Sequence, residues 1–311
     1  MLHSLIGHEI GHLISEDFIA KRVQKGEFLL NNADRIKKSV ILDDLPRGNL
    51  FTQIIKEDRI RVACETAVKA WENGLRELLA DIIGAIIFGP ALLFSIFEIA
   101  LNDDIDSIPS RRNGFYPPWR MRIRTVFKII EEPHERSQLH KTFFPLEIAD
   151  SSLDNVNQKM NDRFNLIKEI SSSDSDIKNL KNDPPVSIAY EQVLKDASEA
   201  TEHFKNKLSD HLKTPDFMYR YLPDLIKRMI HGITPNAYEP SVEKRKAVSL
   251  AEIINAAWFY RISWENDIFD NDGTLNKDIL KLRDRMNRLT LKAIEFADIE
   301  TEFKNFKKGN L

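Results

Sequence analysis

The chain carries only one cysteine, Cys64, so it cannot form a disulfide within itself. This excludes the disulfide-rich class of small secreted domains and suits a reducing compartment. The chain also has no basic segment followed by an apolar run and a cleavage site at its start, which a secretory signal would require. From these two absences we expect a cytoplasmic protein.

A strong excess of one charge sign is missing as well. The 45 Lys and Arg residues are matched by 48 Asp and Glu residues, for a formal net charge of -3, and this balance argues against a nucleic-acid-binding protein. Basic and aromatic residues do alternate between positions 111 and 128. That pattern could bind nucleic acid or phosphate, but we favour a solvated helix face after Pro117 and Pro118. We therefore expect no nucleic-acid partner.

The sequence has no apolar run long enough to cross a membrane. The most apolar stretch, from Ile82 to Phe97, falls short of the roughly 18 residues that a spanning helix needs. Gly89 and Pro90 interrupt it, and proline ends or bends a helix because it lacks a backbone N–H. We expect two buried helices with a bend at this pair, and no membrane partner.

Enough apolar material is present for a globular fold. Of the 311 residues, 42% are hydrophobic and 30% are charged, and the apolar positions recur mostly at helical spacing. The sequence therefore predicts a mainly α protein. We expect a first region at 1–150, a polar linker rich in Ser, Asp and Pro at 151–185, and a C-terminal helical region at 186–311. The last helix, about 276–303, alternates spacings of three and four between apolar residues, which predicts packing on other helices or helix-mediated self-association.

One stretch carries a pattern more specific than its composition. The sequence His-Glu-Ile-Gly-His begins at His8, and an α-helix turns once every 3.6 residues. His8 and His12 therefore share one face and can direct two imidazole nitrogens to a single point, which is half of a tetrahedral zinc site. Glu9 borders the same face and is placed to hold a metal-bound water. Gly7 and Gly11 favour metal over a chance match, because they let another backbone or an ion approach closely.

A zinc site needs a further protein ligand, and Glu77 is the best candidate. Glu77 and Asp81 lie four residues apart on one face of a predicted helix, just before an apolar run. Two carboxylates beside such a surface are costly unless they are paired or bound to metal. Because a metal-binding His donates its second ring N–H to a carboxylate or carbonyl, Asp81 fits the role of orienting a histidine. The alternative, a solvated acidic pair, fits this apolar surrounding less well.

Together the two motifs resemble those of the gluzincin metallopeptidases, in which H-E-x-x-H is followed on a later helix by E-x-x-A-D or E-x-x-x-D. The matching residues are His8, Glu9, His12, Glu77 and Asp81, with Ala80 also agreeing. The resemblance implies a zincin-like helical core in which both histidines and Glu77 bind Zn²⁺. It further implies that Glu9 is the general base and that Asp81 orients the first histidine. It covers residues 2–101.

Two features depart from that family. Residues 116–123 are similar to a stretch that begins with His-Pro and ends with Arg-Ile in some members, but Tyr116 stands in the place of the His. Members also bring a β-sheet before the first motif to align an extended substrate, whereas His8 follows Met1 closely. Either the chain is an N-terminally incomplete piece of a longer protein, or its fold lacks that sheet.

These residues predict a zinc metallopeptidase that acts on a protein or peptide substrate. Glu9 would take a proton from a zinc-activated water as the water attacks a peptide carbonyl. The alternative is a non-enzymatic helical interaction protein with a structural or degenerate metal site. The two hypotheses differ at Glu9, because only the peptidase needs this carboxylate for proton transfer.

Overall fold

The computed structural model describes residues 5–40, 50–131, 153–209, 222–238, 246–264 and 277–307. These residues are mainly helical, as predicted, and their strands are one short antiparallel pair. In chain order the elements are α1 (Leu5–Gln24), α2 (Glu27–Ser39), α3 (Leu50–Phe88), α4 (Pro90–Ala100), η2 (Arg111–Asn113), α5 (Trp119–Glu131), α7 (Asp154–Ser172), α8 (Ser175–Leu180), α9 (Pro184–Ser209), α10 (Leu222–Ile230), β1 (Ala237–Tyr238), β2 (Lys246–Ala247), α11 (Leu250–Trp264) and α12 (Lys277–Lys307).

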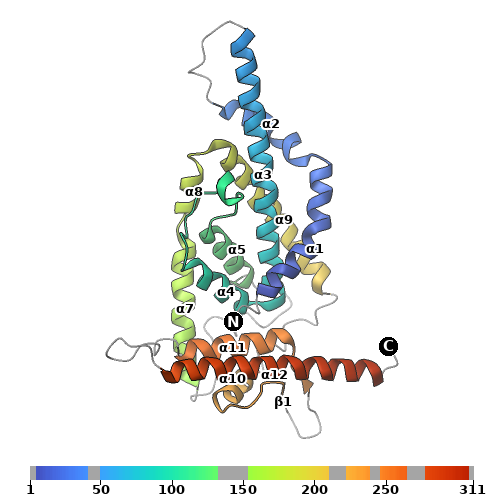
Figure 1. Ribbon diagram of the computed structural model, residues 1–311, viewed down its shortest axis with the longest axis vertical. Coiled ribbons are helices and arrows are strands. Elements are labelled where there is room, and N and C mark those ends of the chain that lie inside the picture. The colour runs from blue at the N-terminus through green and yellow to red at the C-terminus, as the bar shows by residue number, and fades with distance from the viewer. Residues whose placement is uncertain are drawn as a thin grey trace.

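The long helix α3 is the axis of the fold. It contacts α1, α2 and α9 as well as α4 and α5, and α10, α11 and α12 cross beneath its C-terminal end (Figure 1). Its N-terminal turns extend past the body at the opposite end and expose Phe51 and Ile54. From Ala67 onward its apolar residues are buried on almost every side. A helix that is apolar all round requires neighbours all round, so this half of α3 supplies the centre of the core.

The predicted bend at Gly89 and Pro90 is confirmed, because α3 ends at Phe88 and α4 begins at Pro90. The φ of Gly89 is 55°, a value that suits glycine. Asn255, which is fully buried, accepts a hydrogen bond from the Ala91 N–H at 3.1 Å and donates one to the Phe88 carbonyl at 2.9 Å. These contacts satisfy backbone groups that the bend leaves unpaired. Among the described helices, none combines the length and apolar character needed to cross a bilayer.

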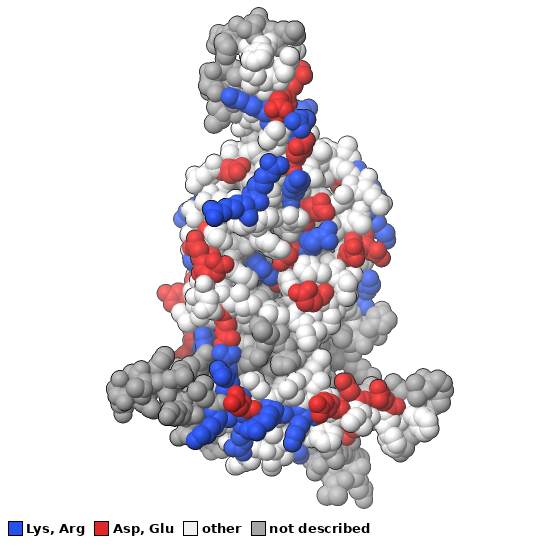
Figure 2. Space-filling view, viewed as in Figure 1, with Lys and Arg blue, Asp and Glu red and all other residues white. Residues whose placement is uncertain are grey.

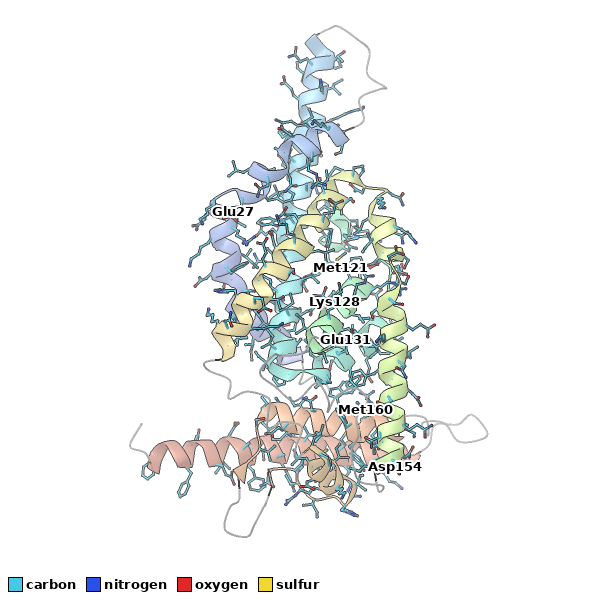
Figure 3. The ribbon with its side chains drawn as sticks, turned by 180° about the vertical axis from the view of Figure 1, so that it is seen from behind. Glu27, Met121, Lys128, Glu131, Asp154 and Met160 are labelled. Atoms are coloured by element: carbon cyan, nitrogen blue, oxygen red, sulfur yellow. The ribbon has the colours of Figure 1, made fainter. Side chains whose placement is uncertain are left out.

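The segment predicted as a polar linker, 151–185, is largely helical instead. Helices α7 and α8 occupy most of it, and Val156, Met160 and Phe164 are buried. Figure 3 shows α7, marked at Met160, alongside α5, which it contacts. The polar residues lie mainly on the outer face of an amphipathic helix. Clusters of Ser and Asp are also typical of loops, and for this reason the sequence alone did not indicate these helices.

Three arginines of α5 turn toward carboxylates, so the favoured interpretation of this segment as a solvated helix face is wrong for them. The pairs are Arg120 with Asp106, Arg122 with Asp81, and Arg124 with Asp176. These contacts tie α5 to α3, to the turn around Asp106 and to α8. Figure 2 shows Lys and Arg mixed with Asp and Glu over much of the visible surface.

The predicted last helix is α12, and its packing on another helix is confirmed. Met286, Leu289 and Ala293 are buried, and α12 contacts α11. Its C-terminal half extends to one side of the body (Figure 1) and exposes Phe296 and Phe303. Figure 2 shows basic side chains over its first half and acidic ones over its second half.

Helices α1 and α3 cross so closely that there is no space for a side chain at their facing glycines. A Cβ atom on Gly11 would stand 2.5 Å from the Ala80 carbonyl oxygen, and one on Gly84 would stand 3.1 Å from the His8 nitrogen. Gly7 also lies in this crossing, close to Gly84. The missing side chains let the histidine face of α1 lie directly on α3.

We expect Gly11→Ala to lower the free energy of unfolding by about 1–3 kcal/mol, as overpacking does. The added methyl group would clash with the Ala80 backbone and push the helices apart, although alanine itself favours a helix by about 1 kcal/mol. Urea unfolding of both proteins measures the difference. Glu16→Ala, at an exposed position of α1, is the control and should change stability little. An unchanged stability for Gly11→Ala would contradict the close crossing.

Candidate metal centre

The α1–α3 crossing brings two pairs of polar residues together. His8 and His12 lie one turn apart on α1, and Glu77 and Asp81 lie one turn apart on α3, so each pair shares a helix face. Only 7% of Glu77 and none of Asp81 is exposed to solvent. Two pairs of residues from distant parts of the sequence therefore form one cluster at the edge of the core.

The ligand atoms of three of these residues converge on one point. His8 Nε2 lies 3.0 Å from His12 Nε2 and 3.4 Å from Glu77 Oε2. His12 Nε2 lies 3.6 Å from Glu77 Oε1. Within the described ranges, His8, His12 and Glu77 form the group of His, Cys, Asp and Glu side chains that could hold a metal ion.

Asp81 orients the imidazole of His8. The His8 Nδ1–H donates to Asp81 Oδ1 over 2.8 Å, which leaves Nε2 as the atom directed at His12 and Glu77. Burial alone would raise the pKa of the Asp81 carboxyl, but the charge and hydrogen bonds of Arg122 outweigh this effect and lower the pKa to about 2. Asp81 is therefore an anion that accepts hydrogen bonds and keeps the Nδ1–H tautomer of His8.

The two histidines differ in their affinity for a proton. Burial lowers the pKa of His8, but its hydrogen bonds to Asp81 and Glu77 outweigh burial and raise the pKa to about 9. Burial and the nearby charge of His8 lower the pKa of His12. Without a cation, His8 therefore donates an Nε2–H toward a neutral His12. A metal ion would compete with this proton for the same lone pair.

Glu9 lies on the solvent side of this cluster. It is exposed on α1 between the two histidines, and it does not belong to the convergent group of His8, His12 and Glu77. Its negative charge acts on His12, whose pKa it raises slightly against the larger effect of burial. The carboxylate is thus near the cluster but accessible to a molecule that approaches from solvent.

Arg122 contacts Glu77 and Asp81, although sequence reasoning assigned it no role, and a loop of unusual backbone conformation precedes its helix α5. In this loop the φ values of Gly114 and Phe115 are 66° and 58°. Glycine adopts a positive φ easily, but in a bulky residue such as Phe115 it strains the backbone. The Tyr190 hydroxyl donates to the Phe115 carbonyl over 2.5 Å and holds the loop in place. The similarity of residues 116–123 to a family stretch was the sequence signal that pointed to a place for this region near the motif helices.

No protein-family model, no curated protein and no solved structure matches this chain. The interpretation of the cluster depends on its own geometry and chemistry.

In protein treated with a chelator, we expect the free energy of unfolding to fall as the pH rises through 9. The pKa of His8 is raised from 6.5 to about 9, so its stabilising contribution is fully present below pH 6.5 and is lost as the pH passes the folded value. The loss is at most about 3 kcal/mol. Urea unfolding near the two ends of this range measures it. His8→Gln is the reference, and an equal loss in both proteins would mean that His8 is not protonated in the folded state.

Proposed function

We propose that the protein is a zinc-dependent metallopeptidase of gluzincin type, in which His8, His12 and Glu77 bind Zn²⁺. The separations of the ligand atoms carry the proposal. Tetrahedral zinc with Zn–N bonds of about 2.0–2.1 Å places its ligand atoms about 3.3–3.4 Å apart. In the cluster the two Nε2 atoms are 3.0 Å apart, His8 Nε2 is 3.4 Å from Glu77 Oε2 and His12 Nε2 is 3.6 Å from Glu77 Oε1. Each histidine thus faces one oxygen of the same carboxylate, and one ligand atom from each of the three residues lies within 4.8 Å of the other two. Two imidazoles and one carboxylate are also the ligand set of a catalytic zinc site.

The cluster has a closed floor and an open side, as hydrolysis requires. The side chains of His8 and Glu77 are 11% and 9% exposed, whereas that of His12 is 25% exposed. Glu9 lies on the open side and is exposed. A peptide can therefore approach past His12 and Glu9, while the apolar core excludes water from the other side.

Each residue then has a distinct chemical task. Zinc, when bound, supplies Lewis acidity that lowers the pKa of water and polarises a carbonyl group. Glu9 takes the proton from the attacking water and passes it to the leaving amine. Asp81 holds His8 in the tautomer that offers Nε2 to the metal.

A helical interaction protein with a structural metal site is the second candidate. The exposed Phe296, Ile299 and Phe303 on α12 favour it, because they lie along one face of that helix. We also propose a cytoplasmic location, which the single free thiol of Cys64 supports.

We expect the purified protein to bind about one zinc ion per chain. His8→Ala and Glu77→Ala should each lose it, because either change removes one of three ligands. Elemental analysis of protein prepared without chelators measures the content. Glu72→Ala, on α3 but outside the cluster, is the control and should keep the ion. If wild type binds no zinc, the cluster is not a zinc site.

We expect Glu9→Gln to retain zinc and stability but to abolish hydrolysis. Glutamine is nearly isosteric with glutamate and cannot accept the proton. Cleavage of a peptide library by wild type, Glu9→Gln and the control Glu16→Gln tests this difference. Glu16→Gln should cleave as wild type does. Equal cleavage by wild type and Glu9→Gln, or zinc-loaded wild type that cleaves nothing, would favour the interaction protein.

A further inference from the structure

We propose that Arg122 is a positioning residue of the metal site, which sets the directions in which His8 and Glu77 offer their ligand atoms. The inference rests on the proposed function. It assigns to a residue of α5 a task that the two motif helices alone do not perform.

The first reason is the bidentate salt bridge between Arg122 and Asp81. Arg122 Nε donates to Asp81 Oδ2 over 2.7 Å, and Nη2 donates to Oδ1 over 2.9 Å. A planar guanidinium on a planar carboxylate fixes the orientation of the carboxylate as well as its position. Oδ1 is the same atom that accepts the hydrogen bond of His8 at 2.8 Å. The angle of the His8 ring therefore depends on how Arg122 holds Asp81.

The second reason is that the same guanidinium borders the metal ligand on α3. Arg122 Nη1 lies 3.6 Å from Glu77 Oε2, the oxygen that is 3.4 Å from His8 Nε2. Two buried carboxylates one turn apart would repel each other without a cation between them. Arg122 supplies that cation. Because one planar guanidinium contacts both carboxylates, it fixes the position of Glu77 relative to Asp81.

Arg122 is itself held in place. Its side chain is 9% exposed, and its guanidinium lies over the Trp119 ring at 4.5 Å from the ring centroid. The Trp119 Nε1–H donates to Asp103 Oδ2 over 2.9 Å. A cation stacked on an aromatic ring has little freedom to rotate. A continuous series of contacts thus runs from the surface at Asp103 to the imidazole of His8.

The chain contains a matched pair that lacks a metal ligand. Arg124 lies on α5 two residues after Arg122. It donates to both oxygens of Asp176 over 2.7 and 3.2 Å, and Asp176 is 1% exposed. Arg124 also donates to the carbonyl of Ser171. The two arginines therefore make similar buried contacts from one helix, but only Arg122 leads to the cluster. This makes Arg124 the control for effects on folding alone.

The experiment titrates metal-free wild type, Arg122→Lys and Arg124→Lys with Co²⁺, whose visible absorption reports the geometry of its ligands. Lysine keeps the positive charge but cannot form the planar fork. We expect Arg122→Lys to bind Co²⁺ about tenfold to a hundredfold more weakly, the range for lost partners of metal ligands, and with an altered spectrum. Arg124→Lys should match wild type in both. Equal affinity and spectrum in all three proteins, or equal losses in the two variants, would overturn the inference.

A second pair of variants tests the route through Asp81. If Arg122 acts through this carboxylate, Asp81→Asn combined with Arg122→Lys should bind Co²⁺ little more weakly than Asp81→Asn alone, because coupled changes do not add. Fully additive losses would overturn the route. If Arg122→Lys does not fold, as judged by circular dichroism, Trp119→Leu replaces it and should weaken Co²⁺ binding severalfold. Wild type that binds no Co²⁺ would contradict the proposed function itself, whereas bound Co²⁺ that is insensitive to these variants contradicts only the role of Arg122.

Discussion

The close crossing of α1 on α3 is the constraint on which the rest of the site depends. Gly11 lies against the backbone of Ala80, and Gly84 lies against the backbone at His8, so the two helices approach without side chains between them. At this separation, the short imidazole and carboxylate side chains of facing helices reach a common point. At an ordinary helix separation of about 8–10 Å the same side chains would be divided by a layer of apolar residues. The glycines therefore permit the geometry of the cluster, although glycine lowers the stability of each helix.

The second constraint is electrostatic. Asp81 is completely buried, and Arg122 and Glu77 are each only 7% exposed. Burying charges is expensive, and replacing such a pair by apolar residues is often neutral or stabilising. Their presence in this core is therefore poor support for a purely structural role and better support for a functional site. Each buried charge is satisfied by an opposite one, and the cluster remains compatible with the packed core around it.

The distribution of exposure around the cluster bears on the choice between the two proposed functions. A structural zinc site is closed on all sides, whereas a catalytic one keeps an accessible position. Here the floor of the cluster is formed by buried parts of α3 and α5, and the accessible side carries Glu9. This asymmetry favours catalysis over a structural role. The exposed apolar face of α12 lies at the lower end of the molecule (Figure 1) and contributes no residue to the His8, His12 and Glu77 cluster.

Local periodicity in the sequence determined which residues share a face. It placed His8 with His12 and Glu77 with Asp81, and the Gly89–Pro90 pair located the bend, because each of these features depends on residues within one or two turns. The resemblance of the two motifs predicted that these faces meet, but their own periodicity did not require it. Only the tertiary structure decided that Arg122 joins Asp81 to Glu77 and that the polar stretch around Met160 is a packed helix. Those outcomes depend on contacts between distant parts of the chain. A helical period specifies the face that a helix offers, but it does not specify the partner that the face will meet.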